Sequence, residues 1–245
     1  MGFQKEYLDL VLVPFGITFM FVYHIALLYR YLNHPETTVV GLENHNKRAW
    51  VERVMELDDL SSMELPLSAL SSNTSAATYL ASISLGLSSL IGAWIASNNK
   101  VFESEIIYGD RTPTTMMLKY ISLLICFFLA FFCFVQATRY FINATYLISM
   151  PNSNTPIYYV EVAIIRGGEF WQLGLRALYF ALNLLLWFFG PIPMFVSSVF
   201  MVVLLHYLDL NSIPLHQFQA SEKQRGQRSI NTMVPNGLLQ VPISS

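Results

Sequence analysis

The chain has 245 residues, of which 54% are hydrophobic and only 12% are charged. Soluble domains carry about twice that share of charged residues, so this composition is typical of an integral membrane protein. The formal net charge is −2, and no block of basic residues is present that would hold a nucleic acid. We therefore expect the lipid bilayer, and not a nucleic acid, to be a partner of this chain.

Apolar runs long enough to cross a bilayer, which takes about 20 residues, recur along the chain. Because a backbone in lipid must satisfy its own hydrogen bonds, each run is expected to be a helix. The runs cover residues 7–31, 74–97, 115–138 and 176–209. The sequence thus predicts an all-α integral membrane protein with four transmembrane helices in residues 1–218. Lysine and arginine are divided evenly between the two predicted sides, so the orientation and the membrane concerned, the plasma membrane or another endomembrane, stay open.

Two segments outside the apolar runs have their own character. Residues 43–58 place Trp50, Val54 and Leu57 at positions i, i+4 and i+7 among charged residues. That spacing predicts a short amphipathic helix at the membrane interface. Residues 219–245 are polar, interrupted by proline and poor in aromatic residues, which predicts a flexible, disordered tail that is available to a protein partner.

The second apolar run carries small residues every three to four positions, namely Ala77, Ala81, Ser84, Ser88, Gly92 and Ala96. Small residues let helix backbones approach closely in lipid, so we expect this face to pack against a neighbouring helix. A pore lined by the serines of this run is the functional alternative.

The fourth run contains a backbone break made of Gly190, Pro191 and Pro193. Each proline removes a helical donor and glycine lets the chain bend, which predicts a kinked helix. A stripe with Arg176, Asn183 and Trp187 ends at this break. Two interpretations are open: a kink that Asn183 tightens, or a broken helix that coordinates an ion or solute, as in transporters.

The end of the third run carries polar residues on one face, namely Gln136, Arg139 and Asn143. This pattern predicts that the helix continues past its apolar part. If the four helices alternate in direction, these residues reach the same side as Arg176 and Asn183, with Glu161 and Glu169 as the nearest opposite charges. Two interpretations are open: the arginines reach out to lipid headgroups, which needs no site, or these residues form a net-positive vestibule.

His24 is the histidine that lies well inside an apolar run, where it is either a hydrogen-bonded structural residue or a proton switch. Motifs for metal ligands, nucleophilic serines, phosphate loops and dinucleotides are not found. The "RGG" of residues 166–168 is a loop signal that is too short for a phosphate cradle. We therefore expect no catalytic residues, no metal and no cofactor, and the chain is not expected to be an enzyme.

The stretches "NHPETTVVGLENHNKRAWVERVM", "RYFINATYLI" and "RGGEFWQLGLRALYFALNLLLWFFGPIPMFVSSVFMVVLLHYLDL" resemble the family called domain of unknown function 599, which is known from land plants and bacteria. The resemblance covers about residues 1–218 and leaves the tail outside. It implies four membrane spans, and it brings no reaction, substrate or catalytic residue with it.

The broken fourth run favours a channel or carrier for an ion or small solute. Because four helices enclose little space, a homo-oligomer is expected. The alternative is a membrane adaptor, in which the Trp50 helix and the tail recruit a protein partner and the four helices only anchor them.

Overall fold

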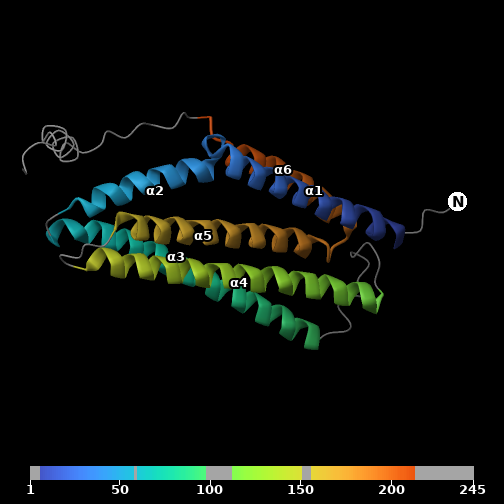
Figure 1. Ribbon diagram of the computed structural model, residues 1–245. Helices are drawn as coiled ribbons and strands as arrows, with labels where there is room; N and C mark the ends of the chain where they lie inside the picture. Colours follow the sequence, from blue (N-terminus) through green and yellow to red (C-terminus); the bar gives the residue numbers. More distant parts are fainter. Residues whose placement is uncertain (1–5, 58–59, 98–111, 151–155, 213–245) are drawn as a thin grey trace, which may run out of the picture. The chain divides into compact units, whose positions relative to one another are not determined.

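The computed structural model describes residues 6–57, 60–97, 112–150 and 156–212, and every regular element among them is helical (Figure 1). The six α-helices are α1 Glu6–Asn33, α2 Val39–Met55, α3 Glu64–Ser97, α4 Pro113–Ser149, α5 Ile157–Leu186 and α6 Pro191–Asp209. Two 3-10 turns, η1 Pro35–Thr37 and η2 Leu60–Met63, precede α2 and α3. Residues 1–214 form one compact unit, and the tail predicted over 219–245 lies outside the described residues. The predicted all-α fold is confirmed.

Helices α3, α4 and α5 pack side by side with α4 in the middle. The ring of Phe141 lies against Gly167 and the ring of Phe134 against Gly174, so α4 and α5 run in opposite directions. A Cβ atom on Gly167 would stand 2.7 Å from the Phe141 ring, which explains why the close approach uses glycine. The loop predicted for residues 166–168 is therefore wrong: the two glycines are helical and serve packing.

The small-residue face of α3 packs against α4, as predicted for most of its length. Four of its residues are 5% exposed or less, namely Ala77, Ala81, Ser84 and Ser88. Gly92 is exposed, with no atom within 4 Å of an added Cβ, and the side chain of Ala96 lies outside the described residues. Ser82, Ser84, Ser88 and Ser89 each donate to the carbonyl four residues earlier, so these hydroxyls are satisfied within the helix and the structure does not favour a serine-lined pore.

Helices α5 and α6 form a hairpin. Asn183 contacts Ser198 and Arg176 contacts Asp209, so α6 returns along α5 in the opposite direction. Gly190 between them has a φ of 142°, a conformation that favours glycine, and Pro191 occupies the first helical position, where its missing N–H costs nothing. The single kinked span predicted over 176–209 is therefore wrong: the break reverses the chain, and the residues before it belong to a helix that begins at Ile157.

Helix α1 runs parallel to α6, with Phe15 beside Phe195 and Tyr23 beside Asp209. Asp9, near the start of α1, contacts Trp187 just after the end of α5. Beyond α1, helix α2 continues along the first half of α5 (Figure 1). Helices α1, α2 and α6 are thus all antiparallel to α5, which is the helix they share.

Helix α2 differs from the predicted interfacial helix over 43–58. It begins earlier, because the Thr38 side chain caps it by accepting from the Gly41 N–H at 3.1 Å. It ends before Leu57, which is 36% exposed, whereas Val54 is only 4% exposed. The apolar face of α2 therefore packs on α5 and its neighbours.

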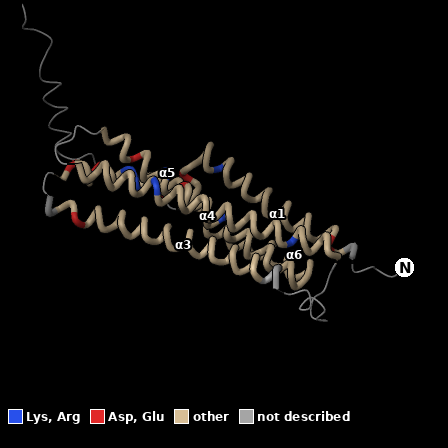
Figure 2. Tube along the Cα trace, turned by 90° about the horizontal axis from the view of Figure 1, so that it is seen from below, with Lys and Arg blue, Asp and Glu red and all other residues tan. Residues whose placement is uncertain are grey.

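Four helices among the described residues, α1, α3, α4 and α6, are long and apolar enough to span a membrane, which indicates a membrane protein. α5 packs between α4 and α6 and is antiparallel to both. Because α1 and α6 are parallel, their C-terminal ends lie on the same side of the membrane. With 37 residues, α4 is about 55 Å long, well beyond a hydrocarbon core of about 30 Å. The charged residues gather toward the end where α3 begins (Figure 2), which we place outside the hydrocarbon.

Candidate functional site

Polar side chains form a row inside the unit, where α1, α5 and α6 pack together. We call it the polar row; it consists of Asp9, Tyr23, His24, Arg176, Asn183, Trp187, Ser198 and Asp209. His24, Arg176, Asn183 and Trp187 were predicted from the sequence as site residues, and the structure places them in this one region.

At one end of the polar row, Asp209 joins three helices. The Arg176 guanidinium donates two hydrogen bonds to its carboxylate, of which the one from Nη1 measures 2.7 Å. The Tyr23 hydroxyl donates to the same carboxylate at 2.6 Å. The side chains of Arg176 and Asp209 are only 12% and 10% exposed. A forked pair with so little water around it is among the strongest polar contacts a protein makes.

In the middle of the row, Asn183 is 1% exposed. Its Nδ2 donates to the Ser198 hydroxyl at 2.7 Å and lies 3.1 Å from the Met20 sulfur. Its Oδ1 is buried and has no hydrogen-bond partner among the described residues. Asn183 therefore joins α5 to α6 across the hairpin, so the interpretation in which it tightens a kink within one helix is wrong.

His24 lies one turn after Met20 in α1. Its Nδ1 donates to the Met20 carbonyl at 2.7 Å, and its ring lies tilted against Phe180 with centroids 5.0 Å apart. The other ring nitrogen, Nε2, is buried without a partner among the described residues. A neutral histidine that donates through Nδ1 has an acceptor at Nε2. His24 and Asn183 thus each present one buried acceptor, and both side chains contact Met20.

At its other end the row reaches an open cavity of about 680 Å³ between α1 and α4. The Trp187 indole donates to Asp9 Oδ1 at 2.7 Å, and both residues line the cavity. The Lys119 ammonium lies 5.2 Å from the centre of the Trp187 ring, a geometry in which cation and ring attract. Lys119 is 1% exposed, so a buried cation and a carboxylate flank the same indole.

The contacts of the described residues do not support the interpretation as a positive vestibule. Arg139 and Asn143 are exposed on α4, and Arg139 Nη1 lies 3.5 Å from Gln136 Oε1. The expected partners are taken by other groups: Glu161 binds Arg48 at 2.7 Å, and Glu169 lies beside Arg166 and accepts from Tyr31. None of the contacts among the described residues joins Gln136, Arg139 or Asn143 to the polar row.

Replacing Arg139 with lysine is accordingly expected to change the free energy of unfolding by less than about 0.5 kcal/mol, as at other exposed positions. The forked geometry of arginine is not used there, so a lysine loses little. Thermal denaturation of the purified protein in detergent measures this. A drop of several degrees would show that Arg139 has a partner that its exposed position does not suggest.

Four residues of the polar row were not assigned to a site from the sequence, namely Asp9, Tyr23, Ser198 and Asp209. The two aspartates stand at the ends of apolar runs, where a charge is ordinary. One signal was present: Asp9, Met20 and Tyr23 are spaced so that they share one face of α1.

The family model described as "Protein of unknown function, DUF599" matches residues 11–214. The match includes every residue of the polar row except Asp9. No curated protein and no solved structure matches the chain.

Proposed function

Because the chain belongs to the family of proteins of unknown function DUF599, whose description names no activity, we propose a function from the geometry alone. The protein is a membrane channel or carrier for a proton or small cation, and the polar row is its path. The row lies within one chain, so the path itself requires no second copy.

The unpaired acceptors in the middle of the row carry this proposal. Buried polar atoms nearly always have a partner, yet Asn183 Oδ1 and His24 Nε2 have none among the described residues. Both atoms accept and do not donate, so the species that satisfies them is a cation or a hydrogen-bond donor such as water or hydronium. Ionisable groups inside a membrane commonly mark ion and proton pathways, and here Asp9 and Asp209 flank the acceptors on either side.

The adaptor hypothesis has less support from the structure. It needs the apolar face of α2 to be free for a partner, whereas Val51 and Val54 on that face are 0% and 4% exposed. The tail that was predicted to recruit a partner lies outside the described residues.

We expect Asn183→Leu to lower cation or proton flux about tenfold, which corresponds to roughly 1.4 kcal/mol. The leucine keeps the volume but removes the buried oxygen. The measurement uses purified protein in liposomes that contain dyes for H⁺, Na⁺ and K⁺. Asn143→Leu is the matched control, since it is the same substitution on the exposed face of α4, and it should transport like the wild type.

A second variant covers the case in which Asn183→Leu does not fold. His24→Gln keeps an amide that can donate to the Met20 carbonyl but removes the titrating ring, so it should fold and lose any pH dependence of flux between pH 5 and 8, the range of histidine titration. Equal flux through wild type, Asn183→Leu and His24→Gln, or no flux of any of the three ions, would remove the basis of the proposal.

A further inference from the structure

A second cavity lies far from the middle of the polar row, between α2 and α3, with α4 and α5 as its floor. Its volume is about 560 Å³, within the range of small-molecule sites. The floor includes the apolar side chains of Phe141 and Ile164. The α3 wall adds the apolar residues Ala69, Leu70 and Ala76, and the other walls carry polar and aromatic side chains.

The polar rim comes from three helices, with Glu43, Asn46 and Lys47 on α2, Asn73 on α3 and Gln172 on α5. Glu43 and Lys47 form an ion pair of 3.3 Å, with side chains 41% and 29% exposed. Gln172 Nε2 lies 3.5 Å from the same Glu43 oxygen. Partly exposed ion pairs of this kind are weak, so a ligand can exchange partners with them. The rim thus offers one carboxylate and one ammonium side by side.

Gly168 leaves the space in which the Lys47 ammonium lies. A Cβ atom at this position would stand 2.6 Å from Lys47 Nζ. The Lys47 side chain therefore lies across the backbone of α5, where a larger residue would displace it. Glycine is unfavourable in the middle of a helix, so its presence here is explained by the space that it leaves.

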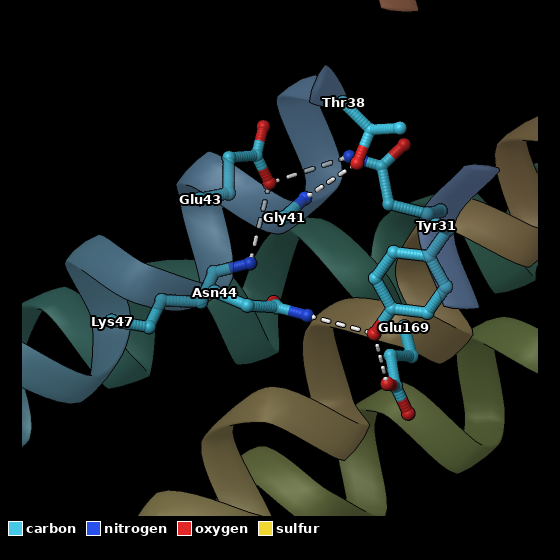
Figure 3. A network of polar contacts seen from close by, with 8 residues as sticks. Tyr31, Thr38, Gly41, Glu43, Asn44, Lys47 and Glu169 are labelled. Atoms are coloured by element: carbon cyan, nitrogen blue, oxygen red, sulfur yellow. Dashed lines mark hydrogen bonds and ion pairs between the residues drawn. The ribbon is translucent and has the colours of Figure 1, made fainter. Parts of the chain in front are cut away.

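The α2 helix is held in register beside this cavity by a chain of hydrogen bonds (Figure 3). Asn44 Nδ2 donates to the Tyr31 hydroxyl at 3.0 Å, and Tyr31 donates to Glu169 at 2.7 Å. Figure 3 shows Glu43 and Lys47 on the same helix as Asn44. The cavity wall is thus tied to α1 and to α5.

Two indoles, Trp50 and Trp171, complete the lining. Tryptophan is enriched where hydrocarbon meets water, and its ring face attracts cations. An apolar base with a paired rim of both charges and a cation-attracting wall is complementary to an amphiphile with a zwitterionic head.

We propose that this cavity binds a phosphoethanolamine group, either as a lipid headgroup or as the free glycerol ester. Lys47 and the rim amides receive the phosphate, and Glu43 receives the ammonium. A primary ammonium fits better than a quaternary one because a carboxylate needs N–H donors for hydrogen bonds. The site is separate from the polar row, so this proposal does not depend on the proposed transport.

Tryptophan fluorescence tests the proposal, because two tryptophans line the cavity. The purified full-length protein in neutral detergent is titrated with dihexanoyl phosphatidylethanolamine, with the phosphatidylglycerol and phosphatidylcholine of the same chains, and with glycerophosphoethanolamine. We expect saturable binding of phosphatidylethanolamine that is at least about tenfold tighter than that of the other two lipids, a difference of roughly 1.4 kcal/mol. Glycerophosphoethanolamine binding equally well identifies a free solute, and binding of the diacyl form alone identifies a lipid.

The matched variants are Lys47→Gln and Arg166→Gln. Both remove a partly exposed cation near the same turn of α5, but only Lys47 lines the cavity. Lys47→Gln should weaken binding about tenfold, and Arg166→Gln should bind like the wild type. Gly168→Ala should fold, since it meets only the flexible end of Lys47, and it should also weaken binding.

The proposal is overturned if no ethanolamine compound binds saturably, if phosphatidylglycerol binds as tightly, or if Lys47→Gln has no effect. Asn183→Leu, in contrast, should bind phosphatidylethanolamine normally.

Discussion

Replacing Arg176 with methionine is expected to lower the free energy of unfolding by about 3–5 kcal/mol, the usual cost of removing one partner of a buried ion pair. The substitution leaves the Asp209 carboxylate inside the protein with only the Tyr23 hydroxyl as a donor among the contacts described. It also removes the polar link between α5 and the end of α6. Thermal denaturation in detergent, followed by circular dichroism at 222 nm, is the measurement.

Two further variants isolate the ion pair as the cause. Arg139→Met removes an exposed arginine from α4 and should change the free energy of unfolding by less than about 0.5 kcal/mol. The double variant Arg176→Met, Asp209→Leu should recover much of the lost stability, because apolar replacements of a buried pair are often neutral or stabilising. A single variant as stable as the wild type, or a double variant less stable than Arg176→Met, would contradict a stabilising pair at this position.

Replacing Gly41 with alanine is expected to lower the free energy of unfolding by a similar amount, about 3 kcal/mol or more. The reason is steric. A Cβ atom on Gly41 would stand 1.9 Å from the Pro35 carbonyl oxygen. That oxygen already accepts hydrogen bonds from the Thr38 backbone and hydroxyl, at 3.1 and 2.9 Å. No side-chain rotation relieves this collision, so the turn before α2 must open. Hydrogen exchange in α2 should become faster and the melting temperature should fall, and both are measured.

Gly86→Ala is the control for this substitution. Gly86 is also helical, and no atom lies within 4 Å of its added Cβ. Alanine is favoured over glycine in a helix by about 1 kcal/mol, so this variant should be slightly more stable than the wild type. A Gly41→Ala variant that is as stable as Gly86→Ala would contradict the close contact between Gly41 and Pro35.

The membrane class and most of the helices could be predicted because they depend on long apolar runs. The third run is an example. Its polar continuation through Gln136 and Asn143 was predicted to stay helical, and α4 extends to Ser149. The first half of α5 was missed because Glu161, Arg166 and Glu169 interrupt its apolar character. Those charges are accommodated by partners on other elements, Arg48 and Tyr31 among them, which no reading of α5 alone reveals.

The candidate site was predicted in part. Asn183 and Trp187 were selected because polar residues and a proline break coincide there, and both belong to the polar row. Arg139 was selected on similar grounds and lies outside it. Helical spacing places residues on a common face, but it does not say whether that face meets another helix or the lipid.

The sequence by itself determined that this protein is helical and belongs in a membrane, because the cost of placing each side chain in hydrocarbon is a property of the residue and adds along the chain. Only the tertiary structure decided that the break at Gly190 reverses the chain. Proline and glycine interrupt a helix without specifying the direction that follows. That direction is set by contacts across the hairpin, such as Asn183 with Ser198 and Arg176 with Asp209, which join residues 15 and 33 positions apart and exist only once the helices have packed.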